Sequence, residues 1–240
     1  MSLTTKSLSF DIRNSSKTND NLCGWRLCCH LLFYKEEAMN TDNITDIAMN
    51  LNNPEWILNH ITIALQKNTD SELVKRPTDL DGIEQYLILQ GEQENAHYSI
   101  KVIPALLSNV GISESTAWEK AMENLCADTQ ITSLEKILSN ITGMPYDNSS
   151  DHTVKFHVIT NSRKCKGAGC IMNRKALRIF AQTYDTNMLF ILPSSVHEMM
   201  IAPYDSSLDL DELSVMVKEI NETQVAPEER LTDRAYILSF

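Results

Sequence analysis

Five consecutive apolar residues at 188–192 constrain the fold of this chain more than any other segment. The run has the length of a strand and no alternation with polar residues, which is typical of a strand covered on both faces. Pro193-Ser194-Ser195 then predicts a turn, after which residues 196–202 are expected to return as a neighbouring strand. The segment therefore predicts the centre of a sheet that lies between two other layers.

Helical and extended patterns alternate around this strand. Apolar spacing and capping residues predict helices at about 54–67, from Ser113 to 125, from Ser133 to 140, from Asn173 to 184 and from Asp209 to 220. Further strands are expected at about 85–89, 98–103, 154–160 and 235–238, and a short strand or turn at 167–172. The sequence thus predicts an α+β fold, a mixed sheet with amphipathic helices packed on it, whose N-terminal part is mainly helical.

The first 38 residues differ from the rest because they show no sustained helical or strand period. Lys35-Glu36-Glu37-Ala38 precedes Met39, and codons for those four residues can carry a purine-rich ribosome-binding sequence. We therefore hypothesise that translation begins at Met39 and that 1–38 is a leader; the alternative is a flexible arm. We expect an N-terminal region at 39–94 and an α/β domain at 95–240, with 39–240 as one domain the other option.

Charge and cysteine usage bound the class of protein. The formal net charge is −11, which argues against a surface that binds nucleic acid or anionic membrane over its whole extent. After the first thirty residues the cysteines are Cys126, Cys165 and Cys170, an odd number in a chain too long to need disulfides. The apolar stretch 22–34 is interrupted by Arg26 and His30, which fits neither a signal peptide nor a membrane span. We expect a cytoplasmic protein.

Several short motifs follow one another between about residues 95 and 236. They are Gly111-Ile112-Ser113-Glu114 with Ala117-Trp118 and Ala121, Val158-Ile159-Thr160-Asn161 with Gly167-Ala168, Ile191-Leu192-Pro193-Ser194-Ser195-Val196-His197-Glu198, Met216-Val217-Lys218-Glu219-Ile220-Asn221, and Glu228-Glu229-Arg230-Leu231-Thr232-Asp233 before Tyr236. In this order they resemble an uncharacterised bacterial family, a domain of unknown function that is frequent in gut-dwelling anaerobes and their mobile elements. The resemblance implies an architecture and a lineage but no reaction.

The end of the buried strand carries the catalytic candidates Ser194, Ser195, His197 and Glu198. Catalytic groups often lie at such ends. Adjacent strand residues point to opposite faces, however, so His197 and Glu198 can line one pocket only if the strand bulges. The segment has neither the second histidine of a zinc protease nor a Gly-x-Ser-x-Gly elbow. The alternative is structural: serines that satisfy backbone groups in a tight turn, and a buried hydrogen bond from His197 or Glu198.

A metal or cofactor site is not expected. Cys165 and Cys170 would need a second ligand pair for zinc, but Cys126, His152, His157 and His197 show no recognisable spacing. A nucleophilic Cys170 acting with His197 is equally weak, because a buried cysteine is commonly a small apolar residue.

The charges are segregated along the chain. No acidic residue lies between Asp151 and Asp185, whereas seven Lys and Arg residues do. Residues 39–240 have a net charge of −12, so the part of this region outside the segment carries −19. Gly167-Ala168-Gly169, between a strand and a helix, also offers backbone N–H groups of the kind that hold phosphate, although it lacks a Walker ending. The alternative is a solvated face that pairs with the protein's own carboxylates. We predict partner or phosphate binding by Arg163, Lys164, Lys166, Arg174, Lys175 and Arg178.

Three functional hypotheses follow. The first is a non-enzymatic bacterial accessory protein that binds a macromolecular or phosphate-bearing partner through the basic segment. The second is a hydrolase or phosphate-ester-processing enzyme that uses His197, Glu198 and Ser195. The third, a toxin-like or anti-defence protein of mobile elements, rests on the family resemblance alone.

Overall fold

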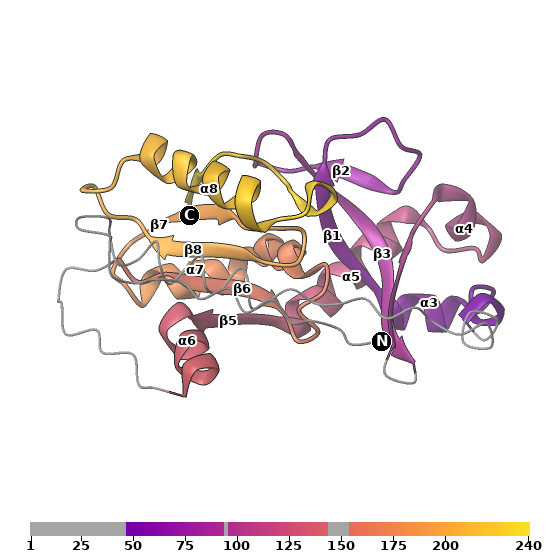
Figure 1. Ribbon diagram of the computed structural model, residues 1–240. Helices are drawn as coiled ribbons and strands as arrows, with labels where there is room; N and C mark the ends of the chain where they lie inside the picture. The colour runs from indigo at the N-terminus through magenta and orange to yellow at the C-terminus, as the bar shows by residue number, and fades with distance from the viewer. Residues whose placement is uncertain (1–46, 94–95, 144–153) are drawn as a thin grey trace, which may run out of the picture.

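The fold consists of two antiparallel sheets with helices packed on them (Figure 1). The computed structural model describes residues 47–93, 96–143 and 154–240, so the expectations for residues 1–38 lie outside the described residues. The predicted α+β class is confirmed. Every pairing among the described strands is antiparallel, whereas we expected a mixed sheet. The difference arises because neighbouring strands such as β7 and β8 are joined by a short loop and need no crossover.

Sheet A is built from the N-terminal half of the described chain. Its strands are β1 (Ile61–Lys67), β2 (Lys75–Pro77), β3 (Ile83–Gln93) and β4 (Ala96–Lys101), with β3 paired to the other three. The expectation that this region is mainly helical is therefore wrong for the described residues.

The predicted helix at 54–67 is correct only in its first half. α3 (Pro54–His60) begins as expected, since the Asn53 side chain accepts from the backbone N–H groups of Glu55 and Trp56. It ends at His60 because the β-branched run Ile61-Thr62-Ile63 favours extended backbone. In β1 the buried residues Ile61, Ile63 and Leu65 alternate, a pattern that overlaps with helical spacing over so short a segment.

The remaining helices begin near their predicted capping residues. α4 (Pro104–Asn109) follows β4, and α5 (Glu114–Asp128) is capped by Ser113, whose hydroxyl accepts from the N–H of Thr116. α6 (Leu134–Thr142) ends at Gly143, which has a φ of 67° and is in the left-handed region that favours glycine. The described chain also contains the 3₁₀ helices η1 (Gly167–Met172) and η2 (Pro227–Glu229) and the α-helices α7 (Arg174–Gln182) and α8 (Leu210–Gln224).

Sheet B contains the apolar run that we placed at the centre of the fold. Its strand order is β5 (Thr129–Ser133), β6 (His157–Asn161), β8 (Met199–Pro203), β7 (Met188–Pro193) and β9 (Tyr236–Ser239). The middle strand is thus β8, and β7 lies beside it. Alternate residues of β7 enter two different hydrophobic clusters, which confirms that this strand is covered on both faces.

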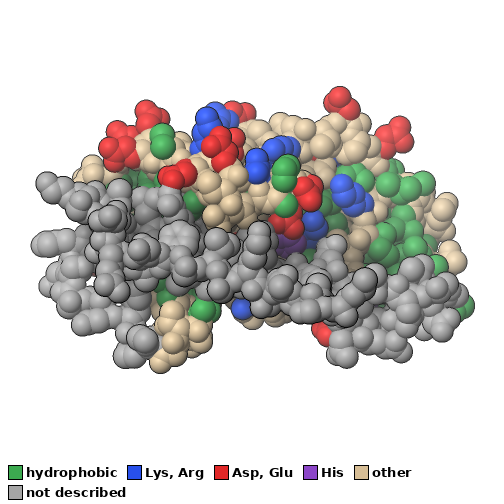
Figure 2. Space-filling view, in the orientation of Figure 1, with side chains coloured by type: hydrophobic (Ala, Val, Ile, Leu, Met, Phe, Trp, Pro, Cys, Tyr) green, Lys and Arg blue, Asp and Glu red, His purple; other side chains and the backbone are tan. Residues whose placement is uncertain are grey.

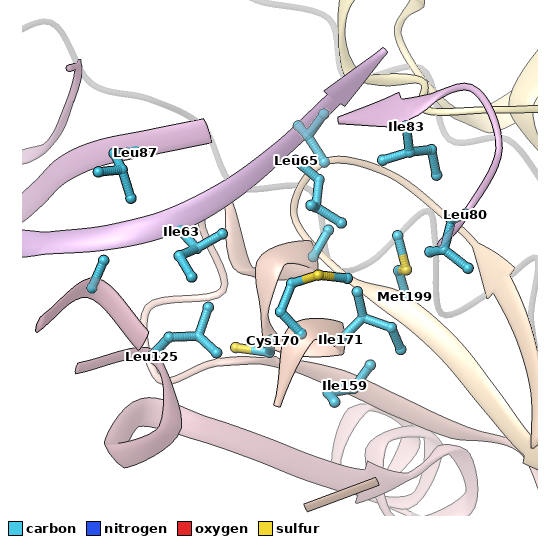
Figure 3. Close-up of a cluster of buried hydrophobic side chains, with 14 of the residues drawn as sticks. Ile63, Leu65, Leu80, Ile83, Leu87, Leu125, Ile159, Cys170, Ile171 and Met199 are labelled. Atoms are coloured by element: carbon cyan, nitrogen blue, oxygen red, sulfur yellow. The ribbon is translucent and has the colours of Figure 1, made fainter. Parts of the chain in front are cut away.

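The larger cluster joins the two sheets. Figure 3 shows Ile63 and Leu65 of β1 near Ile171 of η1, Ile159 of β6 and Met199 of β8. α5 and α7 contribute to the same cluster, while α6 and α8 cover the opposite face of sheet B. Residues before and after 95 therefore share one core, as a single domain over 39–240 would require; the domain boundaries themselves stay predictions. Within the described ranges, no helix is both long and apolar enough to span a membrane.

Candidate functional site

The loop between β7 and β8 holds all four catalytic candidates. β8 begins at Met199, so His197 and Glu198 lie in the loop rather than in the strand that we expected from residue 196. The reason is a tight turn in which Ser195 Oγ accepts from the N–H of His197 at 3.0 Å and Ser195 N–H donates to the Glu198 carbonyl at 3.2 Å. Ser195 thus satisfies backbone groups, which is the structural role we considered for the serines.

The His197 side chain connects three segments of the chain. Its Nδ1 accepts from the Lys166 N–H at 3.2 Å, and its Nε2 lies 3.2 Å from Glu229 Oε1. Because a backbone amide can only donate, Nδ1 is unprotonated and Nε2 carries the proton shared with Glu229. The His197 carbonyl also accepts from Thr160 Oγ1 at 2.8 Å. Both ring nitrogens are therefore engaged inside the protein, and the side chain is only 12% exposed.

Glu229 is the member of this cluster that the sequence did not single out. It lies at the end of η2, where its carbonyl accepts from the Val196 N–H at 2.8 Å. One carboxylate oxygen contacts His197, and the other is buried without a hydrogen-bond partner among the described residues. The sequence feature that could have pointed to Glu229 is its place in the Glu228-Glu229-Arg230 motif. We call Thr160, Lys166, His197 and Glu229 the His197 junction.

Glu198 is separate from this junction in its contacts. Glu198 is only 6% exposed, and no described residue forms a hydrogen bond or ion pair with its carboxyl group. Burial raises the pKa of Glu198 to about 7, and the nearby Lys164 charge opposes that rise only in part. Ser194 is buried too, at 2% exposure, and its hydroxyl has no described partner. The structure therefore does not assemble Ser195, His197 and Glu198 into a catalytic triad.

The glycine loop has a packing role. Gly167 to Met172 are all buried, and the Ala168 N–H donates to the Val196 carbonyl at 3.2 Å. A Cβ at Gly167 would collide with Thr160 and His197, and one at Gly169 would collide with the Ile63 carbonyl. The glycines thus let η1 approach β6 and β1 closely. A phosphate cradle formed by this loop does not fit, because its backbone faces the core.

The loop of residues 162–166, between β6 and η1, is held by hydrogen bonds from buried polar side chains. The Asn161 side chain bonds both the N–H and the carbonyl of Cys165, and Gln90 of β3 donates to the same carbonyl at 2.6 Å. Lys164 and Lys166 have φ values of 54° and 49°, in the left-handed region that non-glycine residues seldom adopt. The loop is therefore fixed in a shape that leaves the Lys164 side chain exposed.

The two cysteines of this region lie in the core and have the environment of small apolar residues. Cys165 and Cys170 are both buried and neither forms a disulfide, and burial raises the pKa of Cys170 to about 12. A thiol in that state is a poor nucleophile. In the described part of the chain, no group of three or more His, Cys, Asp or Glu side chains is arranged to hold a metal ion.

The six predicted binding cations divide into two groups. Arg163 pairs with Asp128 at 3.4 Å and Arg174 with Asp79 at 2.7 Å, while the backbone of Lys166 serves the His197 junction. The others are exposed and form no ion pair with a described residue: Lys164, Lys175 and Arg178. Figure 2 shows one face of the molecule, on which Lys and Arg side chains lie among Asp and Glu. That face is mixed rather than basic.

Three of the family motifs meet in space although they are far apart in sequence. The end of β6, the start of η1, the β7–β8 loop and η2 all supply residues to the His197 junction. A second contact ties two motifs together, since buried Asn221 of α8 donates to the Thr232 carbonyl and to Asp233. The motifs are thus the places where separate segments are joined.

The fold and these junctions define an α+β protein of two antiparallel sheets. Its residues 74–239 match the family described as Family of unknown function (DUF5688), and the chain belongs to that family. The match includes β2, β3 and β4 of sheet A and thus begins before residue 95, where we placed the start of the resemblance. No curated protein and no solved structure matches the chain.

Proposed function

We propose that this protein is a bacterial, cytoplasmic accessory protein that binds an acidic macromolecular partner through the basic segment 163–178. The resemblance carried by the sequence motifs implies a bacterial source, with gut-dwelling anaerobes and their mobile elements as its setting. The observation that carries the proposal is the exposure of Lys164, Lys175 and Arg178, which form no ion pair with a described residue and lie in a stretch free of acidic residues. Exposed cations on an otherwise acidic protein favour contact with an anionic surface.

The exposed side of α7 indicates which kind of anion fits. Lys175, Arg178, Ile179 and Gln182 have helical spacing and are all exposed, and we call them the α7 surface. Ile179 is 54% exposed beside the two cations. An exposed apolar side chain beside charged ones is typical of protein–protein contacts, whereas nucleic-acid sites of this size rely on phosphate contacts and aromatic stacking. An acidic protein surface is therefore the favoured partner.

Charge reversal tests this proposal with a matched control. The test variant is Lys164→Glu/Lys175→Glu/Arg178→Glu. The control, Lys67→Glu/Lys101→Glu/Lys136→Glu, makes the same change in net charge at exposed lysines elsewhere. Fluorescence anisotropy with labelled poly-L-glutamate measures binding, and thermal melting followed by circular dichroism checks the fold of each variant.

We expect the test variant to bind poly-L-glutamate about tenfold more weakly than the control, since three exposed ion pairs at roughly 0.5 kcal/mol each correspond to one decade. Equal binding by both variants, or no binding by the wild type, would contradict the proposal. Tighter binding of a labelled single-stranded DNA than of poly-L-glutamate would indicate that the partner is a nucleic acid and not an acidic protein.

One observation favours the enzyme as a second candidate. A buried carboxyl group whose pKa is about 7, as at Glu198, can exchange a proton at neutral pH. His197 is less suited, because both ring nitrogens are occupied. Hydrolysis of p-nitrophenyl phosphate and p-nitrophenyl acetate by the wild type and by Glu198→Gln tests this version. Turnover that disappears in the variant would support the enzyme; turnover equal in both would exclude Glu198.

A further inference from the structure

An acidic surface that complements the α7 surface lies on α8 of the same protein. Asp211, Val215, Lys218 and Glu222 have helical spacing and are exposed, and we call them the α8 surface. Val215 is 67% exposed at its centre, and Lys218 lies 4.0 Å from Glu222. Glu212 and Glu219 flank the row, so α8 carries four carboxylates and one cation. α7 carries three cations and no carboxylate.

The two surfaces cannot meet within one chain. Leu177 and Ala181 of α7 pack into the cluster between the sheets, whereas Leu213, Val217 and Ile220 of α8 pack into the cluster on the other face of sheet B. Figure 1 shows α8 lying along its side of that sheet. Each helix buries its apolar residues against sheet B, so the exposed rows of α7 and α8 face opposite sides of the molecule.

We infer that the α7 surface of one copy binds the α8 surface of a second copy. This inference rests on the proposed function and names its acidic partner. In the contact, Ile179 and Val215 cover each other while the cations of α7 lie against the carboxylates of α8. Each exposed apolar side chain then loses contact with water, and the surrounding charges set the orientation.

The geometry makes the association head-to-tail. An interface between two different surfaces leaves one free α7 surface and one free α8 surface on every pair, so a chain or a ring of copies forms. Few residues take part and their ion pairs are exposed, so a single contact is weak and sensitive to salt. A second copy is favoured over an unrelated acidic partner because every molecule carries the complementary surface, with an exposed aliphatic side chain at the centre of each.

Sedimentation velocity of the full chain over a concentration series tests the inference. We expect the weight-average mass of the wild type to rise at least about twofold at low salt and to return to the monomer in about 0.5 M NaCl, where the Debye length falls to a few ångströms. Ile179→Ser should reduce association at low salt as well, because the apolar contact is lost.

A pair of variants separates this contact from general charge effects. Lys175→Glu/Arg178→Glu reverses the α7 surface, and Asp211→Lys/Glu222→Lys reverses the α8 surface while keeping Val215. Each variant alone should be monomeric at low salt, because its two surfaces then have the same sign. An equimolar mixture should associate again, because each α7 surface then has an α8 surface of opposite charge on the other variant.

A wild type that stays monomeric at every concentration, or a mixture that fails to regain association, would overturn the inference. Association of either variant by itself would do the same. The proposed function is tested independently: a monomeric wild type whose α7 reversal still loses poly-L-glutamate binding would leave the function standing and remove only the self-association.

Discussion

Replacement of Glu198 by Gln should remove a pH-dependent loss of stability. Burial raises the pKa of this carboxyl group from 4.5 to about 7 in the folded protein. Between those values the folded state holds a proton that the unfolded chain releases, so the free energy of unfolding falls as the pH rises. The stability that the protonated Glu198 carboxyl group contributes is fully present below pH 4.5, the pKa in the unfolded chain, and is lost above about pH 7, the pKa in the folded protein. Glutamine cannot ionise and is free of this dependence.

The magnitude follows from the shift. Each pKa unit corresponds to about 1.4 kcal/mol, so a shift from 4.5 to about 7 corresponds to about 3 kcal/mol. At 6% exposure the Glu198 carboxyl group is little screened by solvent, and no discount for exposure applies. We therefore expect the Glu198→Gln variant to gain about 3 kcal/mol relative to the wild type between about pH 5 and about pH 8.

Urea unfolding followed by tryptophan fluorescence measures this difference, with Trp56 and Trp118 as buried or partly buried reporters. Glu84→Gln is the control of opposite sign. Burial alone would raise the pKa of Glu84, but hydrogen bonds from Gln66, Thr69 and Lys75 outweigh it and lower the pKa, so its stabilising contribution is lost as the pH falls. A Glu198→Gln gain that is the same at both pH values would refute the reasoning.

Three further predictions concern the junctions and the thiols. His197→Ala should destabilise the fold by about 2 kcal/mol in urea unfolding, because it leaves the Lys166 N–H and the Glu229 carboxylate without their partner; a change below about 0.5 kcal/mol would contradict the junction. Gly169→Ala should destabilise the protein more than Gly111→Ala, since a Cβ collides with the Ile63 carbonyl at the first site, whereas at the second it meets no atom and costs only the strain of alanine at a φ of 70°; equal melting temperatures would show that η1 can shift. Iodoacetamide followed by peptide mass spectrometry should modify Cys126 in the folded protein well before Cys165 and Cys170, which are buried, and simultaneous labelling of all three would exclude that burial.

The parts of the fold that could be predicted depend on contacts near in sequence. Ser113, Asn173 and Asp209 are predictable as helix caps because a capping side chain bonds an N–H group two or three residues ahead, and Ser133, the predicted first residue of a helix, caps α6 in the same way. The residues of β1 fit a helix and a strand almost equally well. Their pairing with β3, about twenty residues further on, decided between the two, and no local pattern contains that information.

At the candidate site, too, contacts between residues distant in sequence could not be predicted. Ser195 could be given a turn role because its contacts are with its own neighbours. His197 could not be assigned to Glu229, which lies 32 residues away, or to the backbone of Lys166, 31 residues before it. The motif therefore looked like an incomplete catalytic centre, because its partners come from other segments and one of them is a main-chain group.

The His197 junction and the basic segment are physically connected, and this connection bears on what the family motifs do. Residues 162–166 are fixed at Cys165 by the side chains of Asn161 and Gln90, and at the next residue by His197, through the Lys166 N–H. A cation on a fixed backbone loses less conformational freedom on binding than one on a mobile loop. Lys164 is therefore presented to solvent by the same contacts that join the two sheets. Under the proposed function the motif residues position the binding segment, a role in which seryl, imidazole and carboxyl groups lie close in sequence without forming a triad.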